Sequence, residues 1–519
     1  MNTLHRTLSG PPAVSPGAPE PYSRTVAVPP GDTPGYRGVR EALRSLGLRV
    51  VTDGTGGTGP KAQGEPPGAY CAVRIASPWF GAPPGGGADG PLDRTAVLAA
   101  AERMCAAGGG RLVLVTDAGR WPALGVEPET AADQAADLHW WNELAARVAG
   151  RGVAANTVRI GYAPFLGHRL SAGREADLLR CQAVRRPVAP EDLAGALSML
   201  LSRSAGNVVG ETVPLDGGLE RVVVPFGGTG GSRHGPPAGP DPWSLRGRRF
   251  LVTGASSGIG AACAGELARL GADTVLAARR ADRLAQLAAR ITDTTGRSAH
   301  AVPADLAEPG AGEALLREAE RVAGPVDGLV HAAGVLGLDG PGTGRAARER
   351  LYRLNLFSLV ELAEELTAGW ARGGVRGVIV PIGSVSAQIT PVPHVQNYGA
   401  GKAAVSWFSS HLAMTVARHG IRVNTVLPAG VTTPMKEAAD PAFVEASMRR
   451  VPSGRFSTVE EVAALVSYLA APVSDYLTGT QLRICGGVGT LRPLPELVPL
   501  HDHPGGGAAP GGDERKADG

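Results

Sequence analysis

Short apolar runs alternate with amphipathic helical patterns in the second half of the chain. The runs are RRFLV, DTVLAA, AHAVPA, DGLVHAA, GVIVPI, IRVNTVL and GTQLRI, and segments rich in Ala, Leu and Arg separate most of them. Strands that alternate with helices in this way predict a parallel sheet with helices on both faces. The predicted fold class is therefore α/β, with a Rossmann-like, doubly wound parallel sheet.

The first half repeats this pattern in a weaker form. ELAARVAGRGVAANTVRIGY parallels HLAMTVARHGIRVNTVLPAG, and PEDLAGALSMLLSRSAGNVVGETVPLDGG parallels VEEVAALVSYLAAPVSDYLTGTQLRICGG. Similarity over segments of this length predicts a repeat of whole domains. We therefore expect two Rossmann-like domains in tandem, the first of them degenerate.

Glycine and proline mark the expected boundaries. The chain has 519 residues, too many for one ordinary core, with 74 Gly and 43 Pro. Residues 1–36 and 491–519 lack apolar periodicity and are predicted to be disordered tails, and residues 227–242 have the composition of a linker. The two domains are then expected at residues 37–226 and 243–490.

Charge and cysteine usage exclude several classes of protein. The net charge is only +3 and no basic run is interleaved with aromatic residues, so no nucleic-acid partner is expected. The five cysteines lack ligand or disulfide spacing, which predicts no metal site. The amino terminus has no apolar core of a signal sequence and no apolar run reaches 18 residues, so we expect a cytoplasmic protein with no membrane partner.

A glycine-rich turn follows the first strand of the second half. In TGASSGIG, Gly254, Gly258 and Gly260 precede a helical pattern, as a phosphate-binding loop requires. The spacing also occurs in DGTGGTG, residues 53–59, but Pro60 follows it, so this second match is predicted to be a simple loop.

One tyrosine and one lysine stand four residues apart in NYGAGKAAV. Tyr398 and Lys402 would share a helix face, where an ammonium lowers the pKa of a neighbouring phenol. Lysine occurs only at positions 61, 402, 436 and 516, and an arginine could not replace it in this role. Ser384 follows the strand VIVPI and would meet the pair at the carboxyl end of the sheet.

With these motifs, the residues from Trp243 to Thr490 resemble the short-chain dehydrogenase/reductase family, and within it the β-ketoacyl-acyl-carrier-protein reductases. The resemblance includes TGASSGIG, ADL, HAAG, LYRLNL, the serine and the YxxxK pair, in the family's order. It implies that Tyr398 protonates a carbonyl oxygen, that Ser384 hydrogen-bonds it, that Lys402 holds the cofactor ribose, and that Asn355 passes protons through a water.

The resemblance also implies a binding surface for the cofactor. Its expected members are Gly254, Ser256, Ser257, Gly258, Ile259, Gly260, Arg279, Arg280, Asp305, Leu306, His331, Ala332, Gly334, Tyr398, Lys402, Val431 and Thr433. His331 departs from the family's asparagine and is expected to have a structural role. Ala429 and Cys485 also depart from the pattern.

The second strand of this half ends in Ala278, Arg279 and Arg280, without the acidic residue that accepts the ribose 2′-hydroxyl of NAD. Arginines suit a 2′-phosphate, so NADP(H) is the expected cofactor.

In the first half, the repeat places Thr130 at the tyrosine position and Gln134 at the lysine position. Asp117 or Thr116 falls near the serine position, and no glycine loop with a helix opens this half. Thr130 and Gln134 cannot perform phenol and ammonium chemistry, so this half is expected to be non-catalytic. It would pair with the second half as an intramolecular pseudo-dimer, while a homo-oligomer stays possible. The alternative is that it docks a carrier protein or closes over the substrate.

These patterns predict an NADPH-dependent carbonyl reductase that acts on a small-molecule ketone. Among the possible substrates, a β-ketoacyl or polyketide-type ketone, free or bound to a carrier protein, is ranked first. The alternative is a non-catalytic NADP-binding sensor or scaffold, which would need the glycine loop but not the catalytic residues.

Overall fold

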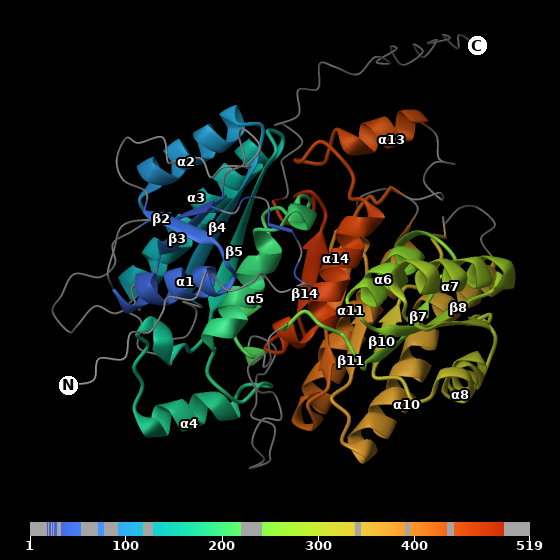
Figure 1. Ribbon diagram of the computed structural model, residues 1–519. Helices are drawn as coiled ribbons and strands as arrows, with labels where there is room; N and C mark the ends of the chain where they lie inside the picture. Colours follow the sequence, from blue (N-terminus) through green and yellow to red (C-terminus); the bar gives the residue numbers. More distant parts are fainter. Residues whose placement is uncertain are drawn as a thin grey trace, which may run out of the picture.

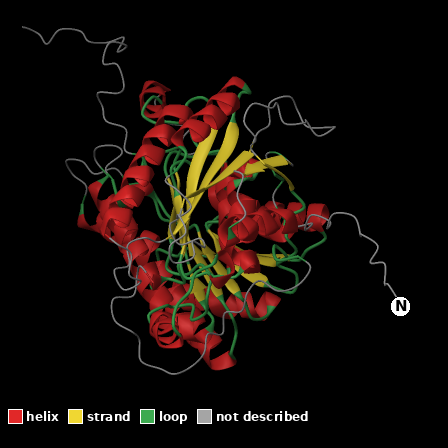
Figure 2. Cartoon of the chain, turned by 90° about the vertical axis from the view of Figure 1, so that its left-hand side faces the viewer, coloured by secondary structure: helices red, strands yellow, loops and turns green. Residues whose placement is uncertain are grey.

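The computed structural model describes residues 18, 20, 21, 23, 25–28, 33–52, 71–76, 92–117, 128–219, 241–337, 344–389, 395–432 and 441–491. The chain forms two α/β halves that lie against each other, the first blue to green and the second yellow-green to red in Figure 1. Each half has a parallel sheet flanked by helices, and Figure 2 shows the strands in the interior. The predicted fold class is confirmed.

The first half has a six-stranded parallel sheet in the order β2-β1-β3-β4-β5-β6. Its strands are β1 (Thr25–Val28), β2 (Arg49–Thr52), β3 (Cys71–Ala76), β4 (Gly110–Asp117), β5 (Val153–Ile160) and β6 (Thr212–Leu215). Helices α1 (Pro34–Ser45) and α5 (Pro190–Leu200) cover one face, and α2 (Arg94–Ala106) and α3 (Pro128–Ala149) cover the other. The connections contain α4 (Ala172–Arg180) and the short turns η2 (Pro164–Leu166) and η3 (Arg203–Ala205).

The second half has a parallel sheet in the order β12-β11-β10-β7-β8-β9, with β13 and β14 paired beside it. Its strands are β7 (Arg249–Thr253), β8 (Asp273–Ala278), β9 (Ala299–Pro303), β10 (Gly328–His331), β11 (Val378–Pro381), β12 (Arg422–Val423), β13 (Thr425–Pro428) and β14 (Gln481–Ile484). These positions match the predicted strands except for IRVNTVL, which was predicted as one strand and forms two, β12 and β13.

The helices of the second half form two layers. α6 (Gly258–Arg269), α7 (Ala281–Thr295) and α14 (Val459–Ala470) pack on one face, and α8 (Ala311–Ala323), α10 (Ser358–Gly373) and α11 (Gln396–Val416) pack on the other. The remaining elements are α9 (Arg345–Tyr352), α13 (Pro441–Met448), the π-helical turn η5 (Arg353–Phe357) and the turns η6 (Val385–Ala387), η7 (Ala417–His419) and η8 (Pro472–Ser474).

The amino-terminal boundary differs from the prediction. Residues 1–36 were expected to be a disordered tail, but Thr25–Val28 form β1 and α1 begins at Pro34. Within the described residues, a strand and a helix therefore open the first half. The strand is only four residues long and prolines follow it, so it has too few residues to show a period. At the other predicted boundaries, residues 221–240 and 492–519 lie outside the described residues.

Two hydrogen-bond arrangements occur once in each half. Asn156 donates to the carbonyl of Val208 and accepts from the N–H of Glu211. Asn424 donates to the carbonyl of Leu477 and accepts from the N–H of Thr480 in the same way. Each asparagine satisfies two buried backbone groups beside the last strand of its half, a position where an unpaired group would be costly.

The second repeated arrangement closes the amino-terminal end of a helix. In α5, Asp192 accepts from the N–H of Ala189 at 2.8 Å and pairs with Arg186 through both carboxylate oxygens. In α14, Glu461 accepts from the N–H of Thr458 at 3.0 Å and pairs with Arg455. The shared strand connectivity and these repeated contacts are what a repeat of the fold would produce.

The two halves meet through reciprocal contacts. α5 contacts η8, which follows α14, and α14 contacts η3, which follows α5. One continuous cluster of buried apolar residues includes α1 and α5 of the first half and α6, α7 and α14 of the second. Reciprocal contacts of this kind characterise a two-fold interface.

A close approach at Gly195 of α5 gives a test of this interface. A β-carbon at Gly195 would lie 2.4 Å from the carbonyl oxygen of Val473, whereas one at Gly265 of α6 meets nothing within 4 Å. We expect Gly195→Ala to lower the free energy of unfolding by about 1–3 kcal/mol through overpacking. The matched control, Gly265→Ala, should raise it by up to about 1 kcal/mol through helix propensity. Denaturant unfolding measures both, and equal effects would mean that the halves do not approach so closely.

Candidate active site

The turn between β7 and α6 leaves no room for side chains at its glycines. Gly254 has a φ of +68°, and a β-carbon there would lie 2.7 Å from the backbone of Ala332. A β-carbon at Gly260 would lie 2.4 Å from the carbonyl oxygen of Gly254. Ser257 precedes the helix without a side-chain hydrogen bond to its first turn. This turn and the amino-terminal end of α6 have the shape that a cofactor pyrophosphate needs.

Arg280 lies directly against this glycine turn. Its Nη2 donates to Ser256 Oγ at 2.8 Å and to Ser257 Oγ at 3.0 Å. Arg279, its neighbour at the end of β8, is exposed, and its charge contributes to lowering the pKa of Asp305. Both arginines therefore belong to the edge of the sheet where the glycine turn lies. Ile259, the next predicted member, packs against the apolar cluster shared by the two halves.

Asp305 has a partner that the sequence did not indicate. Arg350 of α9 donates to its carboxylate at 2.9 Å, and the N–H of Ala307 donates at 3.1 Å. Burial alone would raise the pKa of Asp305, but these bonds and the nearby arginine charges lower it. Leu306 beside it is buried. No local pattern could indicate Arg350 as the partner, because it lies 45 residues further along the chain.

Asn355 is fixed within the π-helical turn η5. Its amide donates to the carbonyl of Val335 at 3.0 Å and accepts from the N–H of Val335 at 3.1 Å. A β-carbon at Gly334 would lie 2.5 Å from Asn355 Oδ1 and 3.6 Å from Lys402 Nζ. The glycine therefore allows the asparagine and the lysine to come close together.

Ser384 begins the turn η6 after β11. It is 7% exposed, and its Oγ accepts from the N–H of Ser386 at 3.1 Å. Tyr398 stands near the start of α11, half-buried, and close enough to Ser384 for the serine hydroxyl to lower its pKa. The structure thus brings the predicted serine and tyrosine together.

Lys402 is 5% exposed, and its Nζ donates to the carbonyl of Ile382 at 2.8 Å. Burial lowers its pKa from 10.5 to about 8. Nζ lies 5.9 Å from the centre of the Tyr398 ring. The expectation of a lowered pKa for Tyr398 is wrong for this structure, because burial raises that pKa by more than the Ser384 hydroxyl lowers it.

His331 at the end of β10 is buried and lies within hydrogen-bond distance of Ser358, with Nε2 2.9 Å from Oγ. The Ser358 hydroxyl donates to the carbonyl of Leu354, so the imidazole must be the donor to Ser358. Burial, and then the charge of Lys402, lower the pKa of His331 to about 3. The ring is therefore neutral and supports the start of α10, beside the turn that carries Asn355.

The other predicted positions are less informative. Val431 is buried and pairs with Ser457 in an isolated bridge, whereas Thr433 lies outside the described residues. In the first half, Gln134 donates to Asp117 at 2.7 Å, so the residues at the expected lysine and serine positions do meet. The Thr130 side chain and residues 53–59 lie outside the described part of the chain.

Among the described residues, no group of three or more His, Cys, Asp or Glu side chains could hold a metal ion. None of the helices in the described ranges is long and apolar enough to cross a membrane.

Comparison with known proteins identifies the family. A family model described as enoyl-(acyl carrier protein) reductase matches residues 94–220 and 254–489, more than half of the chain. The chain is 33% identical over 253 residues to 3beta-hydroxysteroid dehydrogenase 1 of Eggerthella lenta, with 48% of this chain and 96% of that protein covered. It is 37% identical over 254 residues to a granaticin polyketide synthase ketoacyl reductase of Streptomyces violaceoruber, with 46% and 92% covered.

A third relative is the 3-oxoacyl-acyl-carrier-protein reductase of Vibrio cholerae, 33% identical over 247 residues, with 47% of this chain and 98% of that protein covered. The chain belongs to the short-chain dehydrogenase/reductase family, as its motifs predicted. It is an NAD(P)-dependent oxidoreductase of CH–OH and C=O groups.

The buried amine of Lys402 makes stability depend on pH. Its pKa falls from 10.5 to about 8 on folding, so protonation destabilises the folded chain fully below pH 8, and this cost disappears as the pH rises to 10.5. Relative to Lys402→Met, the wild type should gain about 3 kcal/mol of unfolding free energy over that interval. Denaturant unfolding at pH 7.5 and 10.5 measures this gain. Tyr398→Phe keeps the amine and should gain at least as much, because it also lacks a buried phenol that resists ionisation at high pH. A stability difference between wild type and Lys402→Met that does not change with pH would contradict the burial of the charge.

Proposed function

We propose that the second half is an NADPH-dependent ketone reductase and that Tyr398 is its proton donor. The observation that carries the proposal is the meeting of Ser384, Tyr398, Lys402 and Asn355 at the carboxyl ends of β10 and β11. Ser384 lies near enough to Tyr398 to lower its pKa, Lys402 donates to the carbonyl of Ile382 directly before the serine turn, and Gly334 leaves room for Lys402 and Asn355 on one side of it. In parallel sheets this edge is where ligands bind.

Each residue has a distinct task in the proposed reaction. The bound nicotinamide supplies a hydride to the carbonyl carbon. The Ser384 hydroxyl and the Tyr398 phenol hold the carbonyl oxygen by hydrogen bonds, and Tyr398 Oη releases its proton to that oxygen as negative charge develops there. Lys402, with a pKa of about 8, can change protonation near neutral pH and restore the phenol proton. Asn355 would hold the water that links this amine to solvent.

The arginines at the end of β8 support NADPH over NADH. Arg280 already bonds the two serines of the glycine turn, and Arg279 is exposed beside it. No acidic side chain stands at positions 278–280 to accept a ribose 2′-hydroxyl. Two guanidinium groups would instead bind a 2′-phosphate through charge-assisted hydrogen bonds.

The relatives support a β-ketoacyl or polyketide-type substrate, free or bound to a carrier protein. Of the three relatives compared, the ketoacyl reductase shares the highest identity, 37%, and a second acts on 3-oxoacyl groups by its name. The steroid dehydrogenase is 33% identical, so sequence identity favours a ketoacyl substrate only narrowly. No observation favours the sensor alternative, since the catalytic set is complete.

We further propose that the first half is a non-catalytic copy that takes the place of a second subunit. The match of the family model to residues 94–220, the shared strand connectivity and the two repeated hydrogen-bond arrangements support this proposal. Gln134 at the expected lysine position bonds Asp117 and offers no ammonium. Cytoplasmic location stays a prediction.

Replacement of the proton donor tests the catalytic assignment. Tyr398→Phe should reduce the rate of NADPH-dependent ketone reduction by at least about a hundredfold, because only the acidic hydroxyl is lost. NADPH affinity, followed by fluorescence, should remain near that of the wild type. Tyr162→Phe, a phenol change in the first half, serves as the control and should keep full activity. More than about a tenth of wild-type activity in Tyr398→Phe would assign the acid to another group.

Reversal of charge at the end of β8 tests cofactor choice. Arg279→Asp should weaken NADPH at least about tenfold more than NADH, because a carboxylate would then face the 2′-phosphate. Arg290→Asp, in α7 and eleven residues further along the chain, makes the same change in net charge and should leave the preference intact. Dissociation constants for both cofactors provide the measurement. Equal losses of affinity for NADPH and NADH would show that Arg279 does not contact the ribose phosphate.

A further inference from the structure

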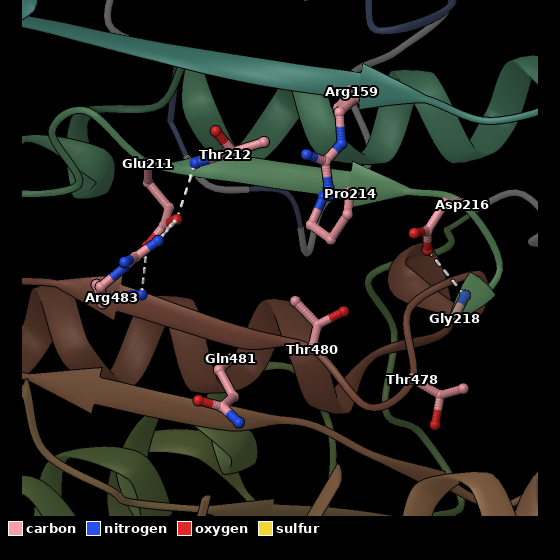
Figure 3. Close-up of a pocket in the computed structure, with 10 residues that line it drawn as sticks. All are labelled: Arg159, Glu211, Thr212, Pro214, Asp216, Gly218, Thr478, Thr480, Gln481 and Arg483. Atoms are coloured by element: carbon pink, nitrogen blue, oxygen red, sulfur yellow. Dashed lines mark hydrogen bonds and ion pairs between the residues drawn. The ribbon is translucent and has the colours of Figure 1, made fainter. Parts of the chain in front are cut away.

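A carboxylate of the first half reaches into the second half at the edge of β14. Glu211 precedes β6 and is 1% exposed. It accepts from the backbone N–H of Arg483 at 2.6 Å, and from Arg483 Nε and Nη2 at 2.9 and 2.8 Å. It also accepts from the N–H of Thr212 at 2.8 Å. Figure 3 shows the two side chains meeting between β6 above and β14 below.

The backbone bond has a structural reason. In the described part of the chain, β14 pairs with β13 alone, so its other edge presents backbone groups without a strand partner. The Glu211 carboxylate accepts hydrogen bonds from one of these N–H groups, that of Arg483, and from the guanidinium of the same arginine. A buried acceptor with several donors fixes position more strongly than a single exposed ion pair.

A polar cavity of about 250 Å³ borders this ion pair. Thr212 and Arg159 line it from the first half, and Thr480 and Gln481 line it from the second (Figure 3). Side chains that face a cavity lack packing contacts on that side. The Glu211–Arg483 pair therefore bridges the halves where close packing is interrupted.

Strand β14 contacts the turn that begins at Ser384 and the helix that carries Tyr398 and Lys402. Arg483 Nη1 donates to Gln388 Oε1 at 3.4 Å, and Gln388 Nε2 donates to Gln481 Oε1 at 3.2 Å. Gln388 closes the turn that Ser384 begins, because its N–H donates to the carbonyl of Val385. Two side-chain contacts therefore join this turn to β14, one from the Arg483 guanidinium and one to the Gln481 amide.

The same strand also holds the helix of the tyrosine and the lysine. Gln481 Nε2 donates to the carbonyl of Ser406 at 3.2 Å and to Ser410 Oγ at 3.1 Å, both on α11. A displacement of β14 would therefore change the position of the Ser384 turn relative to α11. Small errors in such geometry reduce reaction rates strongly.

We infer that Glu211 is a positioning residue for the reductase site: from the first half, it fixes Arg483 and β14, and through Gln388 and Gln481 it sets Ser384 against Tyr398. The inference rests on the proposed function. It gives the first half a task in turnover although that half lacks the catalytic pair. In the repeat, the position of Glu211 corresponds to Thr480 of the second half, which has no carboxylate.

The test compares two buried carboxylates in the full-length protein. Glu211→Gln should lower kcat about tenfold or more while the NADPH dissociation constant remains unchanged, because positioning is lost and cofactor contacts are kept. Asp192→Asn is the matched control, since Asp192 is equally buried and also pairs with an arginine near the interface, but is not linked to the Ser384 turn. Its kcat should stay within about twofold of wild type.

A second variant removes the contacts between Gln388 and strand β14. Gln388→Ala changes an exposed side chain and should reproduce the kcat loss with the thermal stability of the wild type. Wild-type kcat in both Glu211→Gln and Gln388→Ala would overturn the inference. Equal kcat losses in Glu211→Gln and Asp192→Asn would also overturn it, because the effect would then be general loosening of the interface.

Hydrogen exchange separates this inference from the proposed function. Peptides that cover residues 384–389 should exchange faster in Glu211→Gln than in Asp192→Asn or wild type, whether or not a ketone is reduced. Absence of ketone reduction by the wild-type protein would refute the proposed function, and unchanged exchange of this segment would refute the positioning role of Glu211.

Discussion

The structure depends on one shared apolar layer. Helices α1 and α5 of the first half and α6, α7 and α14 of the second bury their side chains in a single cluster, so neither sheet covers that face alone. Burial of apolar area is the main favourable contribution to folding. The close approach of Gly195 to Val473 and the reciprocal contacts of η3 and η8 follow from this requirement. Leu482 and Ile484 of β14 belong to the same layer, so the layer also holds this strand.

The active site carries a cost in stability that the fold must offset. Lys402, Asn355 and His331 place polar groups among buried elements, and each has a backbone or hydroxyl partner. The amine is the most expensive of them, because a charge in this position would prefer water. Burial lowers its pKa, and the proton-carrying role proposed for it depends on that same burial.

Much of the second half could be predicted from sequence because its signals are local. The strands, the glycine turn and the Tyr398–Lys402 pair each lie within a few consecutive residues. The missed features depend on long separations: Arg350 lies 45 residues from Asp305, and Glu211 lies 272 residues from Arg483. The predicted lowering of the Tyr398 pKa was wrong, because the spacing of two residues indicates that their side chains are close but not that they are buried. Strand β1 was missed because four residues between prolines carry no readable period.

The asparagines at positions 156 and 424 satisfy equivalent backbone groups, yet the two halves are parts of one polypeptide. Covalent connection makes their encounter unimolecular, so the effective concentration of one half near the other is set by chain length and not by the amount of protein. Separate subunits dissociate on dilution, whereas this pair cannot. Each half is also free to change its sequence independently, since a substitution at the interface appears once and not on both sides of a symmetry axis.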